Sequence, residues 1–476
     1  MMKNNIKISA LVIAHNEEKK LSTCLKNLIY ADELVVVLDK TNDKSKAIAK
    51  KYGARVFEGN WSIEANRRNF GIKKCLGDWI LEIDADEHAS KNLFVENVSV
   101  RSLASKISTP FYLYSEGNII ENYKSFSDSF KNSSPLICFS VKANSNIQIL
   151  KILKKMGSGA DVVSGGELLK ALKSGIKPNK IVFSGVGKTE DEIRLAIKKD
   201  ILLINVESEN EAILINTISG QLKKKTAIGI RLNPDINAPT HKKISTGKAE
   251  DKFGLSKKNL ISFCLNVKKF KNLKLDAVSV HIGSQILSEN PFKKTLKVLE
   301  EIIKKTKIHF KFVDLGGGFG IAYKKNDKKI NLKSYSKLVE KFKKKYNCSI
   351  IFEPGRAIVG NTAILVTKVQ YLKKGSNKTF AILNAGMNDF MRTALYEAIH
   401  NIVPVIKNSK KNKGPLEFVG PICETTCRFI KYNKYQNLNQ SDYVAISDVG
   451  AYGASLSSNY NTKPLIAEVI INKNKA

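Results

Sequence analysis

The stretch LICFSVKAN, residues 136–144, decides the fold, because it is a short apolar run that ends abruptly in polar residues. Amphipathic stretches with a helical period, such as Ile147–Met156 and Glu190–Lys199, alternate with further runs of the same kind. Those runs lie at residues 161–163, 181–184, 202–206, 227–232, 277–281, 312–315 and 349–352. Eight strands alternating with helices are what a (β/α)8 barrel requires. We therefore predict an α/β protein with a TIM barrel over residues 136–357.

The pattern changes on both sides of the barrel. After Gly355 the apolar runs follow one another without helices, which predicts an antiparallel C-terminal β-domain over residues 358–476. A lead-in over residues 91–135 contains Thr109–Tyr114, which we expect to be the first strand of that domain. Residues 1–90 alternate between strand runs and helical stretches and predict a separate Rossmann-like parallel α/β half-domain.

The composition is that of a globular protein with an excess of lysine. The chain has 476 residues, 43% of them hydrophobic, and a formal net charge of +35. A net positive charge of this size is typical of proteins that bind nucleic acid. Here, however, the lysines are spread over helical faces, and no stretch is rich in arginine or interleaved with aromatic residues. We therefore predict no nucleic-acid partner. The run Ile8–Ala14 is too short for a signal sequence, and no run approaches the length of a membrane span. We expect a cytoplasmic protein, bound to no membrane, with its seven cysteines reduced.

Chemically distinctive residues follow the predicted barrel strands, where the active site of such a barrel lies. Lys142 follows the first strand and can form a Schiff base once desolvation removes its proton. The glycines Gly316, Gly317 and Gly318 expose backbone N–H groups that suit a phosphate, and Ser284 adds a hydroxyl. His281 can stack on a flat ring, and Glu353 can keep a pyridine nitrogen protonated. Together these residues predict pyridoxal 5′-phosphate as cofactor.

Ordered motifs over residues 91–476 resemble the diaminopimelate decarboxylase family of alanine-racemase-like (type III) pyridoxal-phosphate enzymes. The motifs are Val141–Asn144, Ser164–Glu167, Arg231–Pro234, His241, Lys252–Gly254, His281–Gln285, Gly316–Gly320, Glu353–Arg356, Arg392–Tyr396, Gly420–Glu424 and Gly450–Gly453. The resemblance implies that Lys142 forms the Schiff base with the cofactor, that His281 stacks on its ring and that Glu353 holds its pyridine nitrogen. It also implies a phosphate site made of Ser284, Gly316, Gly317, Gly318 and Tyr452.

The same resemblance implies a substrate site and a dimer. Arg356, Arg392 and Tyr396 would bind a substrate carboxylate, since paired guanidiniums suit that group. Cys423 and Glu424 would reach the active site of a partner subunit, with Cys423 or Lys142 as proton donor, so the functional unit is expected to be a homodimer. Cys427 stands where the family usually has Asp, so we expect a contact at the subunit interface to differ from that of the family while the cofactor chemistry is the same.

The first 85 or so residues resemble the nucleotide-sugar half of an inverting family-2 (GT-A) glycosyltransferase. The resemblance rests on Ala14–Glu18, Leu34–Asp39, Lys50–Ala54 and Gly77–Trp79, followed by Asp84-Ala85-Asp86-Glu87. The acceptor half of that family does not follow, so we expect a remnant or a fusion artefact without transferase activity. We predict no metal site, because Asp84 and Asp86 would hold a divalent cation only in an active transferase.

The strongest hypothesis for the function is decarboxylation of meso-2,6-diaminopimelate to L-lysine and CO2, the last step of lysine biosynthesis. A related decarboxylase acting on ornithine, arginine or carboxynorspermidine is the nearest alternative. Glu424 argues against ornithine, whose enzymes of this fold typically carry Asp at that position. Two alternatives come from other classes of protein. A glycosyltransferase with a passenger domain rests on the first 90 residues, and a nucleic-acid-binding protein rests on the net charge.

Overall fold

The structure is a computed structural model and describes residues 8–77, 79–85, 92–238, 246–324, 326–328, 330–408 and 410–472. The chain divides into two compact units. The first unit comprises Met1–Leu93 with Pro404–Lys413 and Lys434–Leu438, and the second unit comprises the remainder. Within the described ranges, no helix is long and apolar enough to cross a membrane.

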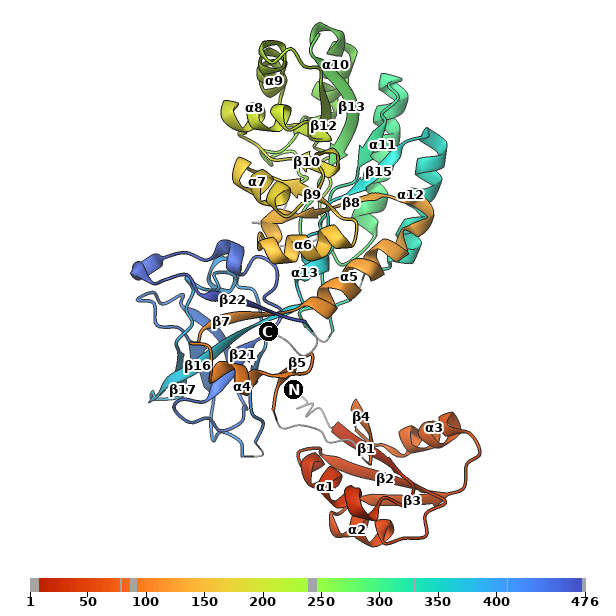
Figure 1. Ribbon diagram of the computed structural model, residues 1–476, viewed down its shortest axis with the longest axis vertical. Coiled ribbons are helices and arrows are strands. Elements are labelled where there is room, and N and C mark those ends of the chain that lie inside the picture. The colour runs from red at the N-terminus through yellow and green to blue at the C-terminus, as the bar shows by residue number, and fades with distance from the viewer. Residues whose placement is uncertain are drawn as a thin grey trace. The chain divides into compact units, whose positions relative to one another are not determined.

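The first unit contains a parallel sheet with helices between its strands (Figure 1). The strand order is β3-β2-β1-β4, so β1 lies inside the sheet and pairs with both β2 and β4. The elements are β1 Ile8–Ala14, α1 Glu18–Leu28, β2 Glu33–Asp39, α2 Ser45–Lys51, β3 Arg55–Gly59, α3 Glu64–Lys74 and β4 Trp79–Asp84. The parallel α/β pattern predicted for this segment is confirmed.

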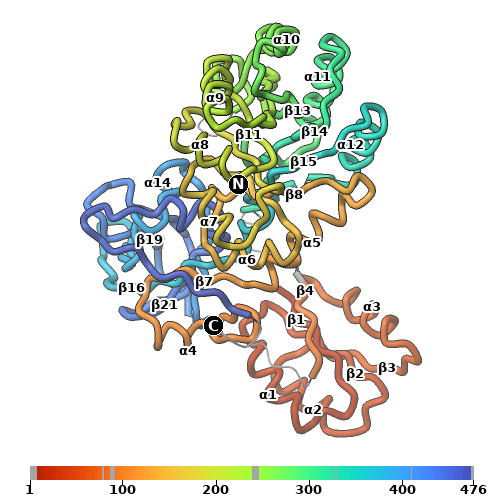
Figure 2. The backbone as a smooth tube through the Cα atoms, turned by 45° about the horizontal axis from the view of Figure 1, so that its top comes forward, coloured from red at the N-terminus to blue at the C-terminus, as the bar shows by residue number. Residues whose placement is uncertain are grey.

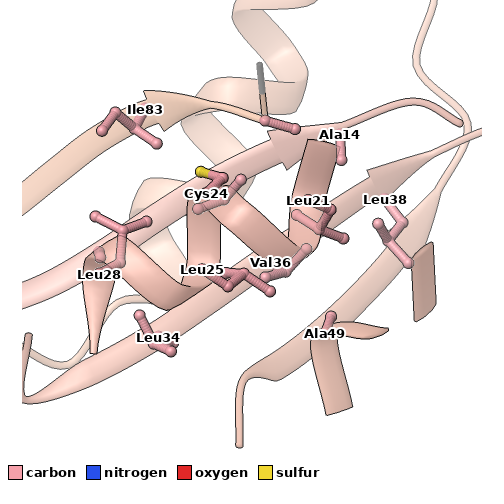
Figure 3. Close-up of a cluster of buried hydrophobic side chains, with 13 residues drawn as sticks. Ala14, Leu21, Cys24, Leu25, Leu28, Leu34, Val36, Leu38, Ala49 and Ile83 are labelled. Carbon is pink, nitrogen blue, oxygen red and sulfur yellow. The ribbon is translucent and has the colours of Figure 1, made fainter. Parts of the chain in front are cut away.

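Helix α1 buries one face against this sheet. Leu21, Cys24, Leu25 and Leu28 recur at helical spacing, and each is fully buried. Figure 3 shows these four side chains together with Val36 of β2 in one apolar cluster. Burying a leucine side chain stabilises a fold by roughly 1.5–3 kcal/mol, so this face anchors the helix to the sheet.

The second unit contains a closed parallel barrel of eight strands within the described residues. Its strands run in the order β10-β11-β12-β13-β14-β15-β8-β9, and helices surround them (Figure 2). The strands are β8 Leu136–Ser140, β9 Gly159–Val162, β10 Ile181–Phe183, β11 Leu203–Val206, β12 Thr226–Leu232, β13 Leu273–Val280, β14 Phe312–Asp314 and β15 Ser349–Phe352. The helices are α5 Glu116–Ser129, α6 Ile147–Lys155, α7 Gly165–Lys173, α8 Glu190–Lys198, α9 Glu209–Gln221, α10 Lys257–Leu265, α11 Asn290–Thr306, α12 Leu332–Tyr346 and α13 Arg356–Val359. The predicted TIM barrel is confirmed.

A second sheet accompanies the barrel, and its pairing differs from the prediction. Its strands are β7 Phe111–Ser115, β16 Ala363–Lys374, β17 Thr379–Leu383, β18 Ile402–Pro404, β19 Leu416–Val419, β20 Arg428–Tyr432, β21 Tyr443–Ile446 and β22 Ala467–Ile471, with α14 Arg392–Tyr396 between β17 and β18. The sheet is mixed rather than purely antiparallel, because β17 pairs with β19, and β7 with β22, in parallel. A long crossover joins β17 to β19 in place of a hairpin, and such a connection permits parallel pairing. The short elements β5 Phe94–Val95, β6 Val98–Ser99 and α4 Val100–Ala104 precede β7.

One backbone and one side-chain hydrogen bond join the β-domain to the residues that follow barrel strand β8. The Tyr452 N–H donates to the carbonyl of Ala143 over 2.8 Å. The side-chain amide of Asn144 donates to the carbonyl of Gly450 over 3.1 Å. These two bonds bring the loop that contains Tyr452 next to Lys142 and hence to the mouth of the barrel.

Candidate active site

A cavity of about 350 Å3 opens at the carboxyl ends of the barrel strands. The side chains that line it come from successive strands because each stands at or just after a strand end. They include Lys142, Ser184, Asn205, Arg231, Ser279, His281, Asp314 and Glu353. Three residues that the sequence predicts for the cofactor site, Lys142, His281 and Glu353, are thus brought together.

Lys142 forms an ion pair with a buried carboxylate. Its Nζ donates to Oδ2 of Asp161, at a distance of 2.6 Å, and the Ser140 hydroxyl donates to the same oxygen. Burial lowers the pKa of the Lys142 ammonium, but the negative charges of Asp161 and Glu353 raise it by more, so its net pKa lies above the ordinary value. The structure therefore favours the protonated form of Lys142 while Asp161 is its partner.

Glu353 belongs to a second group of buried acids. Its Oε1 accepts a hydrogen bond from Ser184, whose hydroxyl accepts one from the Asn205 amide, and that amide also donates to Asp314. Burial raises the pKa of Asp314 to about 6. Burial and the charges of Asp161 and Asp314 raise the pKa of Glu353 well above its usual range. A cationic ring nitrogen next to Glu353 would relieve this repulsion.

His281 is held as a neutral ring beside the predicted phosphate loop. The Gly317 N–H donates to its Nδ1 over 3.1 Å, so the ring proton lies on Nε2. Burial, with the charges of Lys142 and Arg231, lowers the pKa of His281 well below its ordinary value. A Cβ at Gly317 would lie 2.0 Å from the carbonyl oxygen of Glu353, so only glycine allows the loop this close to the neighbouring strand end.

Arg356 and Arg392 meet at one tyrosine hydroxyl. Each arginine is 6% exposed, and Nη1 of each donates to the hydroxyl of Tyr323, over 2.6 Å from Arg356 and 2.8 Å from Arg392. Within the described residues, the side-chain partners of the two guanidiniums are the hydroxyls of Tyr323 and Ser284 and the ring of His400, with no carboxylate among them, and Nε of each is buried without an acceptor. Two buried guanidiniums that share no carboxylate partner are suited to an anionic group. Tyr396 ends the same helix α14 that Arg392 begins.

Of the predicted site residues, Lys142, His281 and Glu353 alone line this cavity within the described structure. Those outside its lining are Gly316, Gly317, Gly318, Ser284, Arg356, Arg392, Tyr396, Cys423, Glu424 and Tyr452. The Ser284 hydroxyl accepts from Nη2 of Arg356 over 3.2 Å, and the Tyr452 ring lies 4.9 Å from the Arg356 guanidinium carbon. Cys423 and Glu424 are exposed on the loop after β19, and the Glu424 carboxylate accepts from the Tyr460 hydroxyl over 2.7 Å. In contrast, Cys427 is buried.

The acidic motif of the first unit is engaged by arginine. Asp84 ends β4, and both of its carboxylate oxygens accept from Nη2 of Arg68, over 3.1 and 3.2 Å. Arg68 also pairs with Glu64 and Glu82. Asp86 lies outside the described residues, as does His241 of the barrel motifs. In the part of the chain that is described, no cluster of His, Cys, Asp and Glu side chains could hold a metal ion.

Several residues of the site were missed by the sequence analysis. Asp161 and Asp314 are acids inside apolar strand runs, which is a signal that could have found them. Tyr323 and His400 carry no such signal, because they lie in loops. His400 is nonetheless 1% exposed, and its Nε2 lies 2.9 Å from Nη1 of Arg392.

Comparisons with known proteins agree with this geometry. Residues 116–360 match the family model of the pyridoxal-dependent decarboxylases, pyridoxal binding domain, and residues 9–98 match that of glycosyl transferase family 2. A diaminopimelate decarboxylase of Aquifex aeolicus is 40% identical over 388 residues, which cover 81% of this chain and 92% of the relative. A diaminopimelate decarboxylase of Helicobacter pylori is 43% identical over 370 residues, which cover 77% of this chain and 91% of the relative.

Solved structures give the same result. The crystal structure of diaminopimelate decarboxylase from Helicobacter pylori complexed with L-lysine is 42% identical, with a TM-score of 0.74, and covers 78% of this chain and 94% of that one. The resemblance inferred from the strand-end motifs is therefore confirmed, and the chain belongs to the diaminopimelate decarboxylase family of pyridoxal-dependent enzymes.

Proposed function

We propose that this protein decarboxylates meso-2,6-diaminopimelate to L-lysine and CO2, with pyridoxal 5′-phosphate as cofactor. The observation that carries the proposal is the pair of buried guanidiniums of Arg356 and Arg392, which has no carboxylate partner among the described residues. A substrate that keeps one carboxylate while it loses another would supply that partner. Ornithine and arginine carry a single carboxylate, the one that decarboxylation removes, so nothing would remain for this pair to bind.

The cavity fits the cofactor. Ser279 and Asn205 line it, and each has a buried side-chain oxygen without a hydrogen-bond partner in the described structure, so a polar group is required there. The acids around Glu353 are crowded enough to hold a protonated ring nitrogen, and the neutral His281 can face a flat ring. When bound, pyridoxal phosphate supplies an electron sink for the pair left at the substrate Cα as the bond to CO2 breaks.

The protein's own residues then have separate tasks in the proposal. Lys142 Nζ attaches the cofactor, and Asp161 controls the proton on that nitrogen. Glu353 keeps the ring nitrogen protonated. The loop Gly316–Gly318, with Ser284 and Tyr452, holds the phosphate, and for this Ser284 must turn from Arg356 to the phosphate. Arg356, Arg392 and Tyr396 hold the carboxylate that is retained.

We further propose a homodimer with shared active sites. Cys423 and Glu424 are exposed in the single chain and do not line the cavity, which supports a role in the cavity of a partner subunit. Cys423 of the partner subunit would then supply the proton that replaces CO2 at Cα, with Lys142 as the alternative donor.

We also propose that the chain is divided into segments with the boundaries 1–90, 91–135, 136–357 and 358–476.

The test is CO2 release by the purified, cofactor-loaded protein from meso-diaminopimelate compared with ornithine. We expect turnover of the first substrate and little of the second. Turnover of ornithine at an equal or higher kcat/KM would overturn the assignment of substrate. A parallel assay of nucleotide-sugar hydrolysis would detect transferase-type chemistry, which we expect to be absent.

A further inference from the structure

We propose that His400 is a positioning residue that holds Arg392 for the carboxylate the substrate retains. Tyr323, in the same proposal, holds both Arg356 and Arg392 and is itself a substrate-binding residue, because its hydroxyl donates a third hydrogen bond to that carboxylate. The inference rests on the proposed function, because it deepens the role given there to the two arginines. Neither residue belongs to the motifs that carried the family resemblance.

The Tyr323 hydroxyl has only one way to complete its hydrogen bonding. A phenol oxygen accepts up to two hydrogen bonds and donates one. The two guanidiniums occupy both acceptor positions, at 2.6 and 2.8 Å. Its own proton has no acceptor among the described residues, so it remains available to a carboxylate bound between the arginines. The ring also lies below the Arg392 guanidinium, with the guanidinium carbon 4.9 Å from its centroid.

His400 holds Arg392 from the opposite side. Its Nδ1 lies 2.9 Å from the carbonyl oxygen of Ser447, which can only accept, so Nδ1 carries the ring proton. Nε2 is therefore the acceptor for Nη1 of Arg392 at 2.9 Å. The ring is packed edge-on against Phe390 and Tyr323, at centroid distances of 4.7 and 4.9 Å.

This arrangement requires a neutral imidazole, and its surroundings keep it neutral. Burial first, and then the positive charges of Arg392 and Arg356, lower the pKa of His400 to about 3. A protonated ring would donate from both nitrogens and repel Arg392. His400 is thus an acceptor across the range of pH in which the enzyme would work, and it orients Arg392 without competing for the substrate's negative charge.

The experiment measures inhibition constants of two probes, L-lysine and 1,5-diaminopentane, with the cofactor-loaded full-length protein. L-lysine keeps the carboxylate, whereas 1,5-diaminopentane lacks it. We expect Tyr323→Phe and His400→Phe to weaken L-lysine binding by about 10-fold or more, as loss of a hydrogen bond to a charged group does, and to change 1,5-diaminopentane binding less than about twofold. His400→Gln should restore most of the affinity, because its side-chain oxygen can accept from Arg392.

Matched controls are Tyr371→Phe, on an exposed stretch of β16, and His309→Phe, on the exposed loop before β14. Neither control should change the binding of either probe. Cofactor absorption reports on folding, and His400→Leu replaces His400→Phe if the latter does not bind the cofactor. In addition, KM for meso-diaminopimelate should rise in Tyr323→Phe while kcat changes little.

The outcomes separate the two proposals. A wild-type protein that binds both probes equally and does not turn over meso-diaminopimelate would overturn the proposed function together with this inference. A wild-type protein that prefers L-lysine, with the same preference in Tyr323→Phe and His400→Phe, would overturn this inference alone.

Discussion

Lys142 Nζ and Asp161 Oδ2 lie 2.6 Å apart at the ends of the adjacent barrel strands β8 and β9. Asp161 is fully buried, so its charge needs this partner. The ion pair favours the protonated form of this nitrogen, and in the proposed function the nitrogen must lose that proton to attach the cofactor. The protonation of Lys142 therefore depends on residues from two strands, because Lys142 follows β8 and Asp161 lies on β9.

Replacing Lys142 by alanine should abolish decarboxylation and the covalent attachment of the cofactor after borohydride reduction, because no other lysine lines the cavity in the described structure. The measurement is the visible absorption of the protein and the mass of the reduced peptide. Lys151→Ala, on the exposed face of α6, is the control and should behave like the wild type. A labelled peptide in the Lys142→Ala protein would refute the assignment.

Asp161→Asn should make cofactor attachment faster near pH 8, because removing the negative charge of Asp161 lowers the pKa of Lys142. The rate of absorbance change, recorded over a series of pH values after mixing apoprotein with pyridoxal phosphate, measures this shift. Ser140→Ala removes a hydrogen bond to Asp161 but not the charge, so its profile should move much less. A profile that shifts to higher pH in Asp161→Asn would contradict the explanation.

Two inactive variants should restore activity when mixed, if the proposed dimer shares its sites. Lys142→Ala and Cys423→Ala homodimers each lack a needed group at both sites. In a heterodimer one site carries both substitutions and the other carries neither, so random mixing should recover about one quarter of wild-type activity. This presumes that loss of a positioned proton donor costs on the order of 10²-fold. If subunit exchange is verified and no activity returns, each site is built within one chain.

Deleting residues 1–90 should leave decarboxylase activity within a few-fold of the full chain, because every residue that lines the cavity belongs to the second unit. Asp84→Ala should have no effect on this activity, since its contact with Arg68 lies within the first unit. Steady-state rates normalised to bound cofactor provide the measurement. A truncated protein that binds the cofactor but is inactive would show that the first unit supports the site.

Acid should destabilise the wild type more than His400→Gln. His400 has its pKa lowered to about 3 in the folded protein, whereas an unfolded histidine titrates near 6.5. Unfolding therefore takes up a proton below about pH 6.5, and the stability present above that pH is lost as the pH falls. For this one group the loss is about 2 kcal/mol of unfolding free energy between pH 7 and pH 5. Thermal unfolding at both pH values should show a smaller decrease in Tm for the variant; an equal decrease would contradict the buried, neutral ring.

The amino-acid sequence by itself determined the order and type of the barrel strands, and it placed three of the residues proposed to hold the cofactor at one end of the barrel. Alternation of apolar runs and amphipathic helices is a local property, and the carboxyl ends of parallel barrel strands meet at one face. Lys142, His281 and Glu353 could therefore be placed together from their positions after strands. The family motifs also named Arg356 and Arg392 as a pair.

Only the tertiary structure decided which groups control these residues. The Tyr323 hydroxyl accepts hydrogen bonds from Arg356 and Arg392, which lie 33 and 69 residues later in the sequence. His400 is oriented by the carbonyl of Ser447, 47 residues later in the sequence. The parallel pairing of β17 with β19 likewise depends on a crossover whose path no local pattern records. Contacts of this kind depend on which loops the closed barrel and the mixed sheet bring together. The burial of a side chain and the pKa of a titratable group follow from this packing, and the residues next to it in the sequence do not determine them.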